Sequence, residues 1–219
     1  MVNMLYYLEL NESINFSGYE RFLKLLSLEK QVQIHKFRFD IDKKLSLFSD
    51  LFVRYLACKA LKLNNSDLIF ERNTYGKPYL IEFPDFQYNI SHTRSAIAIG
   101  LSDKPIGVDI EKIKPAELKI ADRFFCKNEC DYILSGNKRQ DELFYEVWTK
   151  KEAYIKWVGK GLSMSLTSFD VTNIAIRTML HSTEINGYII TICSNSAFDT
   201  DLYRLTENQV DEILLEFAT

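Results

Sequence analysis

Long apolar stretches are absent from this 219-residue sequence, and so is any marked excess of charge of one sign. No apolar run approaches the roughly 20 residues that a membrane-spanning helix needs. The N-terminus lacks the basic and then apolar pattern of a secretory signal. The net charge of −3 argues against a protein whose main task is to coat nucleic acid. We therefore expect a cytoplasmic protein with neither a membrane nor a nucleic acid as its partner.

Cysteine is scarce, and no two cysteines form a Cys-x-x-Cys pair. The four that are present lie within hydrophobic or helical patterns: Cys58, Cys126, Cys130 and Cys193. Cys126 and Cys130 are spaced for one helix face, but no histidine is near enough in the sequence to complete a familiar zinc pattern. We expect reduced cysteines in the interior or on helices. The sequence also lacks low-complexity tracts and short-period repeats.

The composition that remains is that of an ordinary globular protein, with 47% hydrophobic and 26% charged residues. A chain of this length suits one large domain or two compact ones of about a hundred residues each. The Lys104-Pro105 pair is typical of a hinge between halves of similar size. We expect one half to comprise residues 1–104 and the other residues 105–219.

Hydrophobic periodicity predicts a mixture of strands and helices along the whole chain. Strands are expected over 4–10, 68–70, 78–81, 106–111, 169–171, 174–179 and 188–193. The stretch 86–101 is expected to form two more strands, broken at 91–94. Helices are expected over 18–39, 43–61, 115–134, 144–162 and 207–217.

The helix expected over 144–162 is informative because charge interrupts its apolar stripe. At the helical period, Lys151 falls in the middle of a face formed by Phe144, Val147, Trp148, Tyr154, Ile155 and Val158. An ammonium there is costly unless an anion meets it, although the side chain can instead snorkel to the surface. Glu152 and Lys156 lie one turn apart at the edge of the stripe, where they form either part of a site or an ordinary helix pair. The glycines at 159 and 161 can stop the helix in a left-handed cap.

The strand expected over 106–111 carries two carboxylates on one side. Alternation sends Ile106, Val108 and Ile110 to one face and Gly107, Asp109 and Glu111 to the other. Like charges this close repel one another unless a cation or hydrogen-bond donors lie between them. Oxygen ligands of this kind suit magnesium, which commonly binds one or two protein carboxylates together with substrate phosphates. The alternative is an edge strand that faces solvent.

Three further stretches carry groups that suit a phosphate. The run Tyr75-Gly76-Lys77-Pro78 predicts a tight turn that presents an aromatic ring, a lysine and free backbone groups. Ser91-His92-Thr93-Arg94 combines hydroxyl, imidazole and guanidinium groups at a strand end, and Lys30 lies in a basic, aromatic-bearing helical stretch. A plain turn and a solvated helix face are the alternatives. No carboxylate near Ser91 and His92 completes a catalytic triad.

Together these groups describe a site for a multiply phosphorylated small molecule, and the motifs that carry them resemble those of a known family. Gly107-Val108-Asp109-Ile110-Glu111 is followed by Trp148-Thr149-Lys150-Lys151-Glu152-Ala153, by Lys156 and by Gly159-Lys160-Gly161-Leu162. This order resembles the 4′-phosphopantetheinyl transferase superfamily. Tyr75-Gly76-Lys77-Pro78 and Asn89-Ile90-Ser91-His92 match further motifs of its surfactin-synthetase-activating branch. The motifs span nearly the whole chain in order.

The resemblance implies an α+β fold: a pseudo-dimer of two similar α/β halves, each a small antiparallel sheet with packed helices. It implies a monomer that holds coenzyme A and Mg²⁺, or Mn²⁺, in the cleft between the halves. The implied reaction transfers 4′-phosphopantetheine from coenzyme A to a serine of an apo acyl or peptidyl carrier protein domain. Adenosine 3′,5′-bisphosphate is the other product.

The same resemblance assigns roles to individual residues. The metal, which bridges to the pyrophosphate, is bound by Asp109, Glu111 and Glu152. The catalytic residues are Glu152 as the base toward the carrier serine, with Lys151 and Lys156 on the pyrophosphate and Lys156 at the departing oxygen. The 3′-phosphate is contacted by Lys30, Ser46 and His92. Ser91 makes a further phosphate contact. The adenine rim is formed by Tyr75, Gly76, Lys77 and Pro78. Where relatives often carry a second basic residue one turn after Lys30, this chain has Gln33.

Two other function classes share parts of this pattern. One is a magnesium-dependent hydrolase or nucleotide-binding enzyme that uses water in place of a protein acceptor. The other is a non-catalytic module that binds coenzyme A, against which the intact set of three carboxylates argues. The sequence leaves open whether carriers of nonribosomal peptide, polyketide, lysine or fatty-acid pathways are served.

Overall fold

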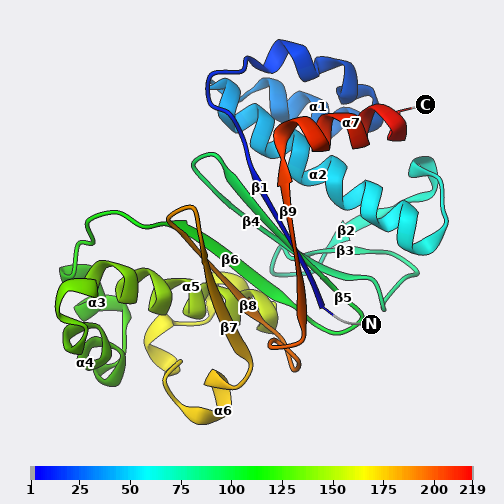
Figure 1. Ribbon diagram of the computed structural model, residues 1–219. Helices are drawn as coiled ribbons and strands as arrows, with labels where there is room; N and C mark the ends of the chain where they lie inside the picture. The colour runs from blue at the N-terminus through cyan, green and yellow to red at the C-terminus, as the bar shows by residue number, and fades with distance from the viewer. Residues whose placement is uncertain (1–2, 219) are drawn as a thin grey trace.

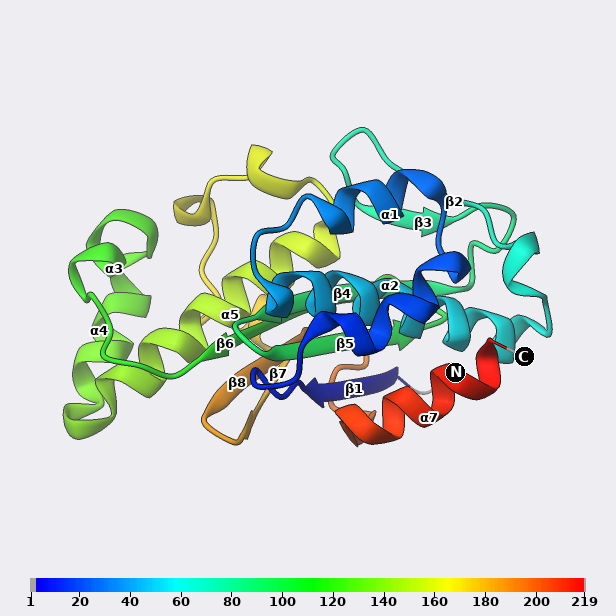
Figure 2. The ribbon, with the colours of Figure 1, turned by 90° about the horizontal axis from the view of Figure 1, so that it is seen from above.

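The computed structural model describes residues 3–218, apart from the side chains of Lys138 and Leu162. Residues 1–2 and 219 of the two expected halves lie outside the described residues. Two sheets with helices on their outer faces make up the molecule (Figure 1). Seen from above, α3 and α4 lie at one end of the molecule, and α7 and both chain ends lie at the other (Figure 2).

The first half supplies one helical layer and most of one sheet. In chain order its elements are β1 (Asn3–Glu9), the 3-10 helix η1 (Phe16–Leu25), α1 (Leu28–His35), α2 (Asp40–Leu61), η2 (Asn65–Asp67), β2 (Phe70–Arg72), β3 (Pro78–Leu80), β4 (Gln87–Thr93) and β5 (Ala96–Ser102). Strands β2 and β3 form a separate hairpin.

The second half begins at β6 and contains the longest helix after α2. Its elements are β6 (Gly107–Lys112), α3 (Lys119–Phe124), α4 (Lys127–Ser135), η3 (Asn137–Arg139), α5 (Gln140–Val158), η4 (Gly161–Ser163), η5 (Leu166–Ser168), α6 (Ile174–Arg177), β7 (Leu180–Ile185) and β8 (Tyr188–Cys193). The chain then continues into β9 (Thr200–Thr206) and α7 (Glu207–Phe217).

The sheet topology joins the end of the chain to its beginning. The first sheet has the strand order β4-β5-β1-β9, and the second has the order β6-β8-β7. All pairs are antiparallel except β1 with β9, which run parallel from Asn3 opposite Thr200 to Glu9 opposite Thr206. The expected boundary near Lys104 separates the two sheets, but β9 and α7 return to the first one.

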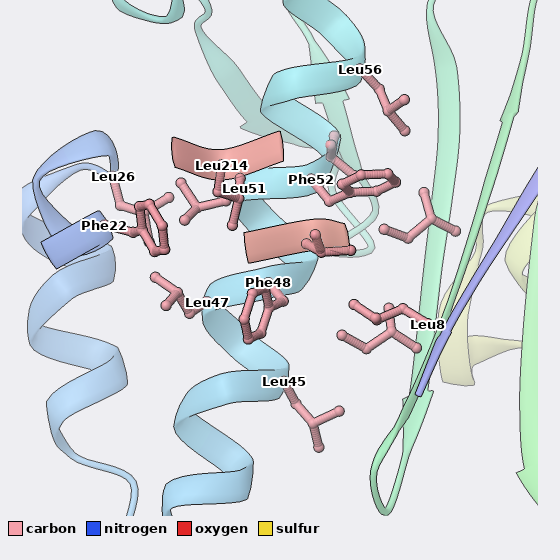
Figure 3. Packing of buried hydrophobic residues seen from close by; sticks show 14 of the residues in the cluster. Leu8, Phe22, Leu26, Leu45, Leu47, Phe48, Leu51, Phe52, Leu56 and Leu214 are labelled. Carbon is pink, nitrogen blue, oxygen red and sulfur yellow. The ribbon is translucent and has the colours of Figure 1, made fainter. Parts of the chain in front are cut away.

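Three apolar clusters hold these layers together. The first lies between the first sheet and the helices η1, α2 and α7, where side chains of α2 interdigitate with those of its neighbours (Figure 3). The second lies between the second sheet and α3, α4 and α5. The third lies between the two sheets and is built largely from small and β-branched residues of β1, β5, β6 and β8. The order of layers is therefore helix, sheet, sheet, helix, as expected for an α+β pseudo-dimer of two α/β halves.

The two sheets approach closely because β5 carries a glycine at the contact. A Cβ atom on Gly100 would lie 2.4 Å from the Cγ2 atom of Val108 and 2.9 Å from the Cδ1 atom of Ile106, well inside van der Waals distance. Val108 and Ile106 are fully buried in this contact. The expected alternation of β6 is thereby confirmed: its apolar face packs on the first sheet, and Asp109 and Glu111 face the other way.

Several predicted elements are confirmed nearly to the residue, namely the first strand, the helix over 43–61, strand 188–193 and the helix over 207–217. Gly159 ends α5 in a left-handed conformation with φ of 75°, as the glycine motif predicts. All four cysteines are free. Between residues 3 and 218, no helix is long and apolar enough to cross a membrane.

Other expectations were wrong because local side-chain caps override the apolar period. The helix expected over 18–39 is divided, since the hydroxyl of Ser27 accepts a hydrogen bond from the Lys30 amide and starts α1 afresh. Residues 174–177 form α6 in place of a strand, because the Asn173 side chain caps that turn. The break expected at 91–94 is shorter: β4 continues to Thr93, and only Arg94, with φ of 49°, adopts the left-handed conformation. The helix expected over 115–134 is likewise divided, between α3 and α4.

Candidate functional site

The candidate site lies where β4 of the first sheet meets β6 of the second. Side chains of β4 at alternate positions, which point to one face, reach across to β6. The bonds are Asn89 Oδ1 to the Val108 amide (2.8 Å), Ser91 Oγ to Asp109 Oδ1 (2.8 Å) and Thr93 Oγ1 to Glu111 Oε2 (3.2 Å). The two expected carboxylates of β6 are thus held by hydroxyl donors from the other half of the chain.

Lys156 joins this junction from α5. Its ammonium lies 2.6 Å from Asp109 Oδ1 and 2.9 Å from Ser91 Oγ. The helix reaches this position because it packs very closely on β6: a Cβ atom on Gly107 would lie 2.0 Å from the Ala153 carbonyl oxygen. Ser91, Asp109 and Lys156, which come from three separate stretches of sequence, therefore form one bonded group.

Asp109 is the most deeply buried member of the group, with 5% of its surface exposed. Burial raises the pKa of its carboxyl group, and Lys156 and Ser91 oppose that shift. Its second oxygen, Oδ2, is also buried and accepts no hydrogen bond within the described part of the chain. An unpaired buried carboxylate oxygen is costly, so this atom marks a position where a further cation or donor would be stabilising.

Glu111 and Glu152 add two more carboxylates to the same place. Burial raises the pKa of Glu111, and so does the Asp109 carboxylate. The pKa of Glu152 is raised by the same two causes, in the same order. Both glutamates thus interact with Asp109 and share its electrostatic environment; Lys156 opposes the rise in pKa of all three carboxyl groups, and Lys114 also opposes that of Glu111.

The metal expected from the sequence can be tested against this arrangement. In residues 3–218, no three His, Cys, Asp or Glu side chains lie close enough together to form a ready-made metal site. The donor chemistry nevertheless fits a hard cation, since all three candidate ligands are carboxylates, one with a buried unpaired oxygen. The residues present are therefore compatible with magnesium, although their side chains do not surround a common point here.

A large cavity opens on the first half beside this group. It has a volume of about 790 Å³, within the usual range for small-molecule pockets. Four of the residues expected to contact coenzyme A line it: Lys30, Ser46, Pro78 and His92. Asn89 and Ile90 of β4 also line it, so the cavity adjoins the strand that carries Ser91.

The cavity wall carries charges of both signs. Lys30 is paired with Asp50 at 2.9 Å. Partial burial lowers the pKa of the His92 imidazole, and the ammonium groups of Lys156 and Lys30 lower it further. His92 therefore lies within the electrostatic reach of both lysines, and the three basic groups connect the cavity to the acidic group on β6.

The turn expected at residues 75–78 is present between β2 and β3, with Gly76 at φ of 87°. It lies against the end of α5, so that two separate sequence motifs meet across the halves. Lys77 donates from Nζ to the main-chain carbonyls of Lys156 (2.7 Å) and Ile106 (3.1 Å). Tyr75 and Gly76 are exposed on this turn.

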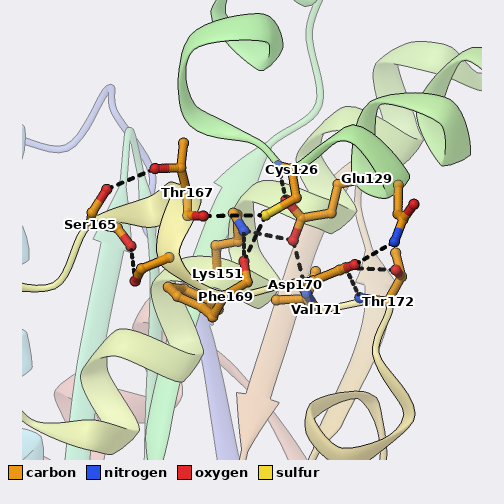
Figure 4. Close-up of polar contacts among 11 residues, drawn as sticks. Cys126, Glu129, Lys151, Ser165, Thr167, Phe169, Asp170, Val171 and Thr172 are labelled. Carbon is orange, nitrogen blue, oxygen red and sulfur yellow. Dashed lines mark hydrogen bonds and ion pairs between the residues drawn. The ribbon is translucent and has the colours of Figure 1, made fainter.

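Lys151 does not lie with these residues. Its side chain is completely buried and forms an ion pair of 2.6 Å with Glu129, which is also completely buried (Figure 4). The expectation that Lys151 contacts the pyrophosphate is therefore not met; of the two alternatives for this ammonium, an anionic partner is present and the side chain does not reach the surface. Lys151 lies about 100° around the helix from Glu152. Its side chain therefore points into the second apolar cluster.

The surroundings of Glu129 explain why so buried an ion pair is tolerated. Glu129 accepts hydrogen bonds from the amides of Val171 (2.8 Å) and Cys126 (2.7 Å) in addition to the Lys151 ammonium. Lys151 donates also to the carbonyl of Phe169 at 2.8 Å (Figure 4). The Cys126 bond caps α4 itself, whereas the bonds to Val171, Phe169 and Lys151 join separate segments, so this network fixes α4 and the chain around Val171 to α5.

For some residues of the site, the sequence did not predict the role that the structure shows. Asn89 and Thr93, which belong to the motifs noted above, bond β6 and share the alternation of Ser91; the break expected at 91–94 concealed that alternation. Asp50, the partner of Lys30, lies on α2 four residues after Ser46, where helical spacing places both on one face. Glu129 has no sequence signal as the partner of Lys151.

Two family models match the chain in sequence. Residues 105–197 match the model of the 4′-phosphopantetheinyl transferase superfamily, and residues 15–102 match that of the 4′-phosphopantetheinyl transferase N-terminal region. The chain is 40% identical over 153 residues to the 4′-phosphopantetheinyl transferase Sfp of Bacillus subtilis (strain 168), covering 69% of this chain and 68% of that protein. It is 32% identical over 201 residues to the 4′-phosphopantetheinyl transferase gsp of Aneurinibacillus migulanus, covering 86% and 84%.

The ion pair of Lys151 can be tested by its effect on folding. Lys151→Met leaves the Glu129 carboxylate buried without its cation, so the free energy of unfolding should fall by about 3–5 kcal/mol. Chemical denaturation measures this change. The double variant Lys151→Met/Glu129→Gln should be more stable than the single variant, and Lys127→Met, which breaks an exposed ion pair, should change stability by no more than about 0.5 kcal/mol. Unchanged stability together with lost ligand affinity would place Lys151 in the ligand site after all.

Proposed function

The chain belongs to the 4′-phosphopantetheinyl transferase superfamily, and we propose that it transfers 4′-phosphopantetheine from coenzyme A to a serine of an apo carrier protein domain. The acceptor is an acyl or peptidyl carrier, and the second product is adenosine 3′,5′-bisphosphate. The observation that carries this proposal is the bonded group of Ser91, Asp109 and Lys156, which lies beside a ligand-sized cavity.

The proposed orientation of coenzyme A follows from the distribution of positive charge. The 3′-phosphate binds at Lys30, Ser46 and His92, which line the cavity. The pyrophosphate lies nearer the junction, where Lys156 and the hydroxyl of Ser91 are adjacent. The exposed turn at Tyr75 and Gly76, with Pro78 in the cavity wall, forms the rim on the adenine side. Gln33 also lines the cavity, so Lys30 is the lysine of α1 available there.

We further propose that Asp109, Glu111 and Glu152 hold a divalent metal ion. The support is their shared electrostatic environment and the unpaired Oδ2 atom of Asp109. When bound, Mg²⁺ or Mn²⁺ would neutralise negative charge on the pyrophosphate. All three proposed ligands are carboxylates, and hard cations such as these prefer oxygen ligands.

The chemistry needs a positioned nucleophile and neutralised phosphates, with no covalent intermediate on this chain. The hydroxyl oxygen of the carrier serine forms a bond to the phosphorus that bears pantetheine. The bond from that phosphorus to the bridging oxygen breaks, and the electron pair leaves with adenosine 3′,5′-bisphosphate. Glu152 accepts the serine proton, directly or through water. Lys156 stabilises the charge that develops on the departing oxygen.

A monomer suffices for this reaction, because both halves of the pseudo-dimer are parts of one chain. The expectations of a cytoplasmic location, and of no membrane or nucleic acid among the partners, stay predictions. Recognition of the carrier surface determines which pathway's carriers are modified. A panel of apo carriers would test this.

The metal proposal predicts a specific pattern of loss. Asp109→Asn and Glu111→Gln keep size and hydrogen bonding but remove the charges that hold the ion. Each should lower Mg²⁺ affinity in titration calorimetry by at least about tenfold, the lower end of what the loss of a charged ligand contact costs. Transfer should stop on chelation of divalent ions and return when Mg²⁺ is restored. Full activity in the presence of excess chelator would disprove the assignment.

The assignment of the 3′-phosphate predicts a difference between two ligands. Dephospho-coenzyme A should bind the unmodified protein more weakly than coenzyme A, because Lys30 and His92 lose their partner. His92→Ala should remove most of that difference, as measured by calorimetric Kd values for both ligands. A Lys62→Ala variant serves as the control, because Lys62 is exposed and does not line the cavity. Equal Kd values for the two ligands in the unmodified protein would mean that the phosphate is held elsewhere.

The transferase proposal predicts a covalent product on the carrier. With coenzyme A, Mg²⁺ and an apo carrier, intact-mass spectrometry should show one phosphopantetheinyl group per carrier and an equal amount of adenosine 3′,5′-bisphosphate. Replacement of the acceptor serine by alanine should stop both events, since the nucleophile belongs to the carrier. Glu152→Gln should retain the fold of α5 but fail in transfer, because it loses the base and a metal ligand.

The same experiment separates the alternative functions. Release of nucleotide without any carrier would show a hydrolase that uses water as the acceptor. Tight binding of coenzyme A without transfer to carriers from several pathways would show a binding module. Either outcome contradicts the proposed transfer reaction.

A further inference from the structure

We propose that Lys77 is a positioning residue that fixes the catalytic end of α5 across the junction of the two halves, and that it does so without contacting coenzyme A. The resemblance of the sequence places this residue on the adenine rim. Its ammonium instead donates to the main-chain carbonyls of Lys156 at 2.7 Å and Ile106 at 3.1 Å. Both acceptors belong to the other half of the chain.

The first acceptor lies at the C-terminal end of α5. The last four carbonyls of a helix have no partner within the helix, and this end carries the negative pole of the helix dipole. Lys77 supplies a donor and a positive charge to the carbonyl of Lys156, the residue whose side chain bonds Asp109. The same contact therefore fixes the backbone from which the Lys156 ammonium extends.

The second acceptor lies immediately before β6. Ile106 precedes Gly107, and Asp109 follows two residues later on the same strand. Because one nitrogen bonds both carbonyls, Lys77 links the start of β6 to the end of α5. The ion pair of Lys156 with Asp109 joins the same two elements at 2.6 Å. The Lys77 hydrogen bonds and the Lys156–Asp109 ion pair therefore join α5 to β6 at two points. The Lys77 bonds set the spacing between these two elements that the ion pair requires.

The turn that carries Lys77 is held by hydrogen bonds of its own. The side-chain oxygen of Asn73 accepts hydrogen bonds from the amides of Tyr75 and Lys77, both at 2.9 Å. The side-chain amide of Asn73 donates to the carbonyl of Gly159 at 3.2 Å, which is a second contact to the end of α5. Lys77 is thus presented by a turn that is already fastened to the helix it caps.

Lys77 is half-buried, and its ammonium is occupied by the two main-chain carbonyls. Pro78, the next residue, lines the cavity, whereas Lys77 does not. Among the described residues, no carboxylate forms an ion pair with Lys77, and Cys193 is the titratable side chain whose charge acts on it. Burial lowers the pKa of Lys77 to about 8. The two main-chain carbonyls therefore hold this ammonium within the protein.

Small movements of α5 would matter because the packing beneath it leaves no space. The backbone of Ala153 and Trp157 lies directly on Gly107, where a Cβ atom would be 2.0 Å and 2.4 Å from the nearest backbone atoms. Without the Lys77 contact, the last turn of the helix keeps this support but loses its fastening to β6. Lys156 would then sample positions in which it no longer meets Asp109 and Ser91.

The test compares Lys77→Met with the unmodified protein and rests on the proposed transferase activity. Methionine retains the aliphatic stem but removes the donor. We expect kcat for transfer to fall at least about tenfold, since misplacing a reacting group by about 1 Å costs up to 10²-fold, while the Kd of coenzyme A, which Lys77 itself does not contact, changes by a much smaller factor than kcat. Hydrogen exchange should become faster at the amides of the last turn of α5. Lys77→Arg, which keeps a cationic donor, should give a kcat between those of the other two proteins.

Lys104→Met is the matched control, because Lys104 is exposed and lies only two residues before Ile106; it should change neither kcat nor hydrogen exchange. An increase in the Kd of coenzyme A with unchanged kcat would show that Lys77 contacts the ligand and would overturn the proposal. If Lys77→Met does not fold, Lys77→Arg decides: a kcat that falls by a larger factor than Kd rises supports positioning, and an unchanged kcat overturns it. If the unmodified protein transfers nothing, the proposed function fails, and hydrogen exchange at the end of α5 alone decides the role of Lys77.

Discussion

The contact between β4 and β6 is the constraint on which the site depends. In the described chain these strands belong to different sheets, and side chains of β4 replace the main-chain ladder that would otherwise join them. Because these bonds come from hydroxyl and amide groups at alternate positions, they set the register of the two sheets. The same donors then stabilise carboxylates that would repel one another if left alone. The same few side chains of β4 therefore hold the two sheets together and stabilise the carboxylates of β6.

The lysines of α5 show how position on one helix decides between structure and chemistry. Lys151 is fully compensated by Glu129 and by a carbonyl, so its charge is balanced within the core. Lys156 faces a cluster with more negative than positive charge and is partly exposed. The first arrangement is complete without any ligand. The second leaves carboxylate oxygens that a ligand or a metal ion can still satisfy, which is where binding energy is available.

The sequence predicted what depends on periodicity and left out what depends on tertiary partners. Alternation in 106–111 placed Asp109 and Glu111 on the correct face, and the helical period placed Glu152 and Lys156 at the edge of the core. The partner of Lys151 could not be predicted, because Glu129 lies 22 residues away on a helix whose orientation is set only by packing. The role of Lys77 was hidden for the same reason, since main-chain carbonyls leave no signature in a sequence. Strand β9 was missed because it is largely exposed, so that burial contributes little to its pattern.

The parallel pairing of β1 with β9 makes the elements from β6 to β8 an insertion between the strands of the first sheet. Asn3 lies opposite Thr200, so the closing contact of the first sheet joins residues nearly a whole chain length apart. The loop-closure entropy of a contact of such high sequence separation must be overcome before the contact is formed, which slows folding. During synthesis, the strands β6, β7 and β8 are all available before β9 emerges. The half that carries the acidic residues can therefore assemble while the half that lines the cavity still awaits its last strand.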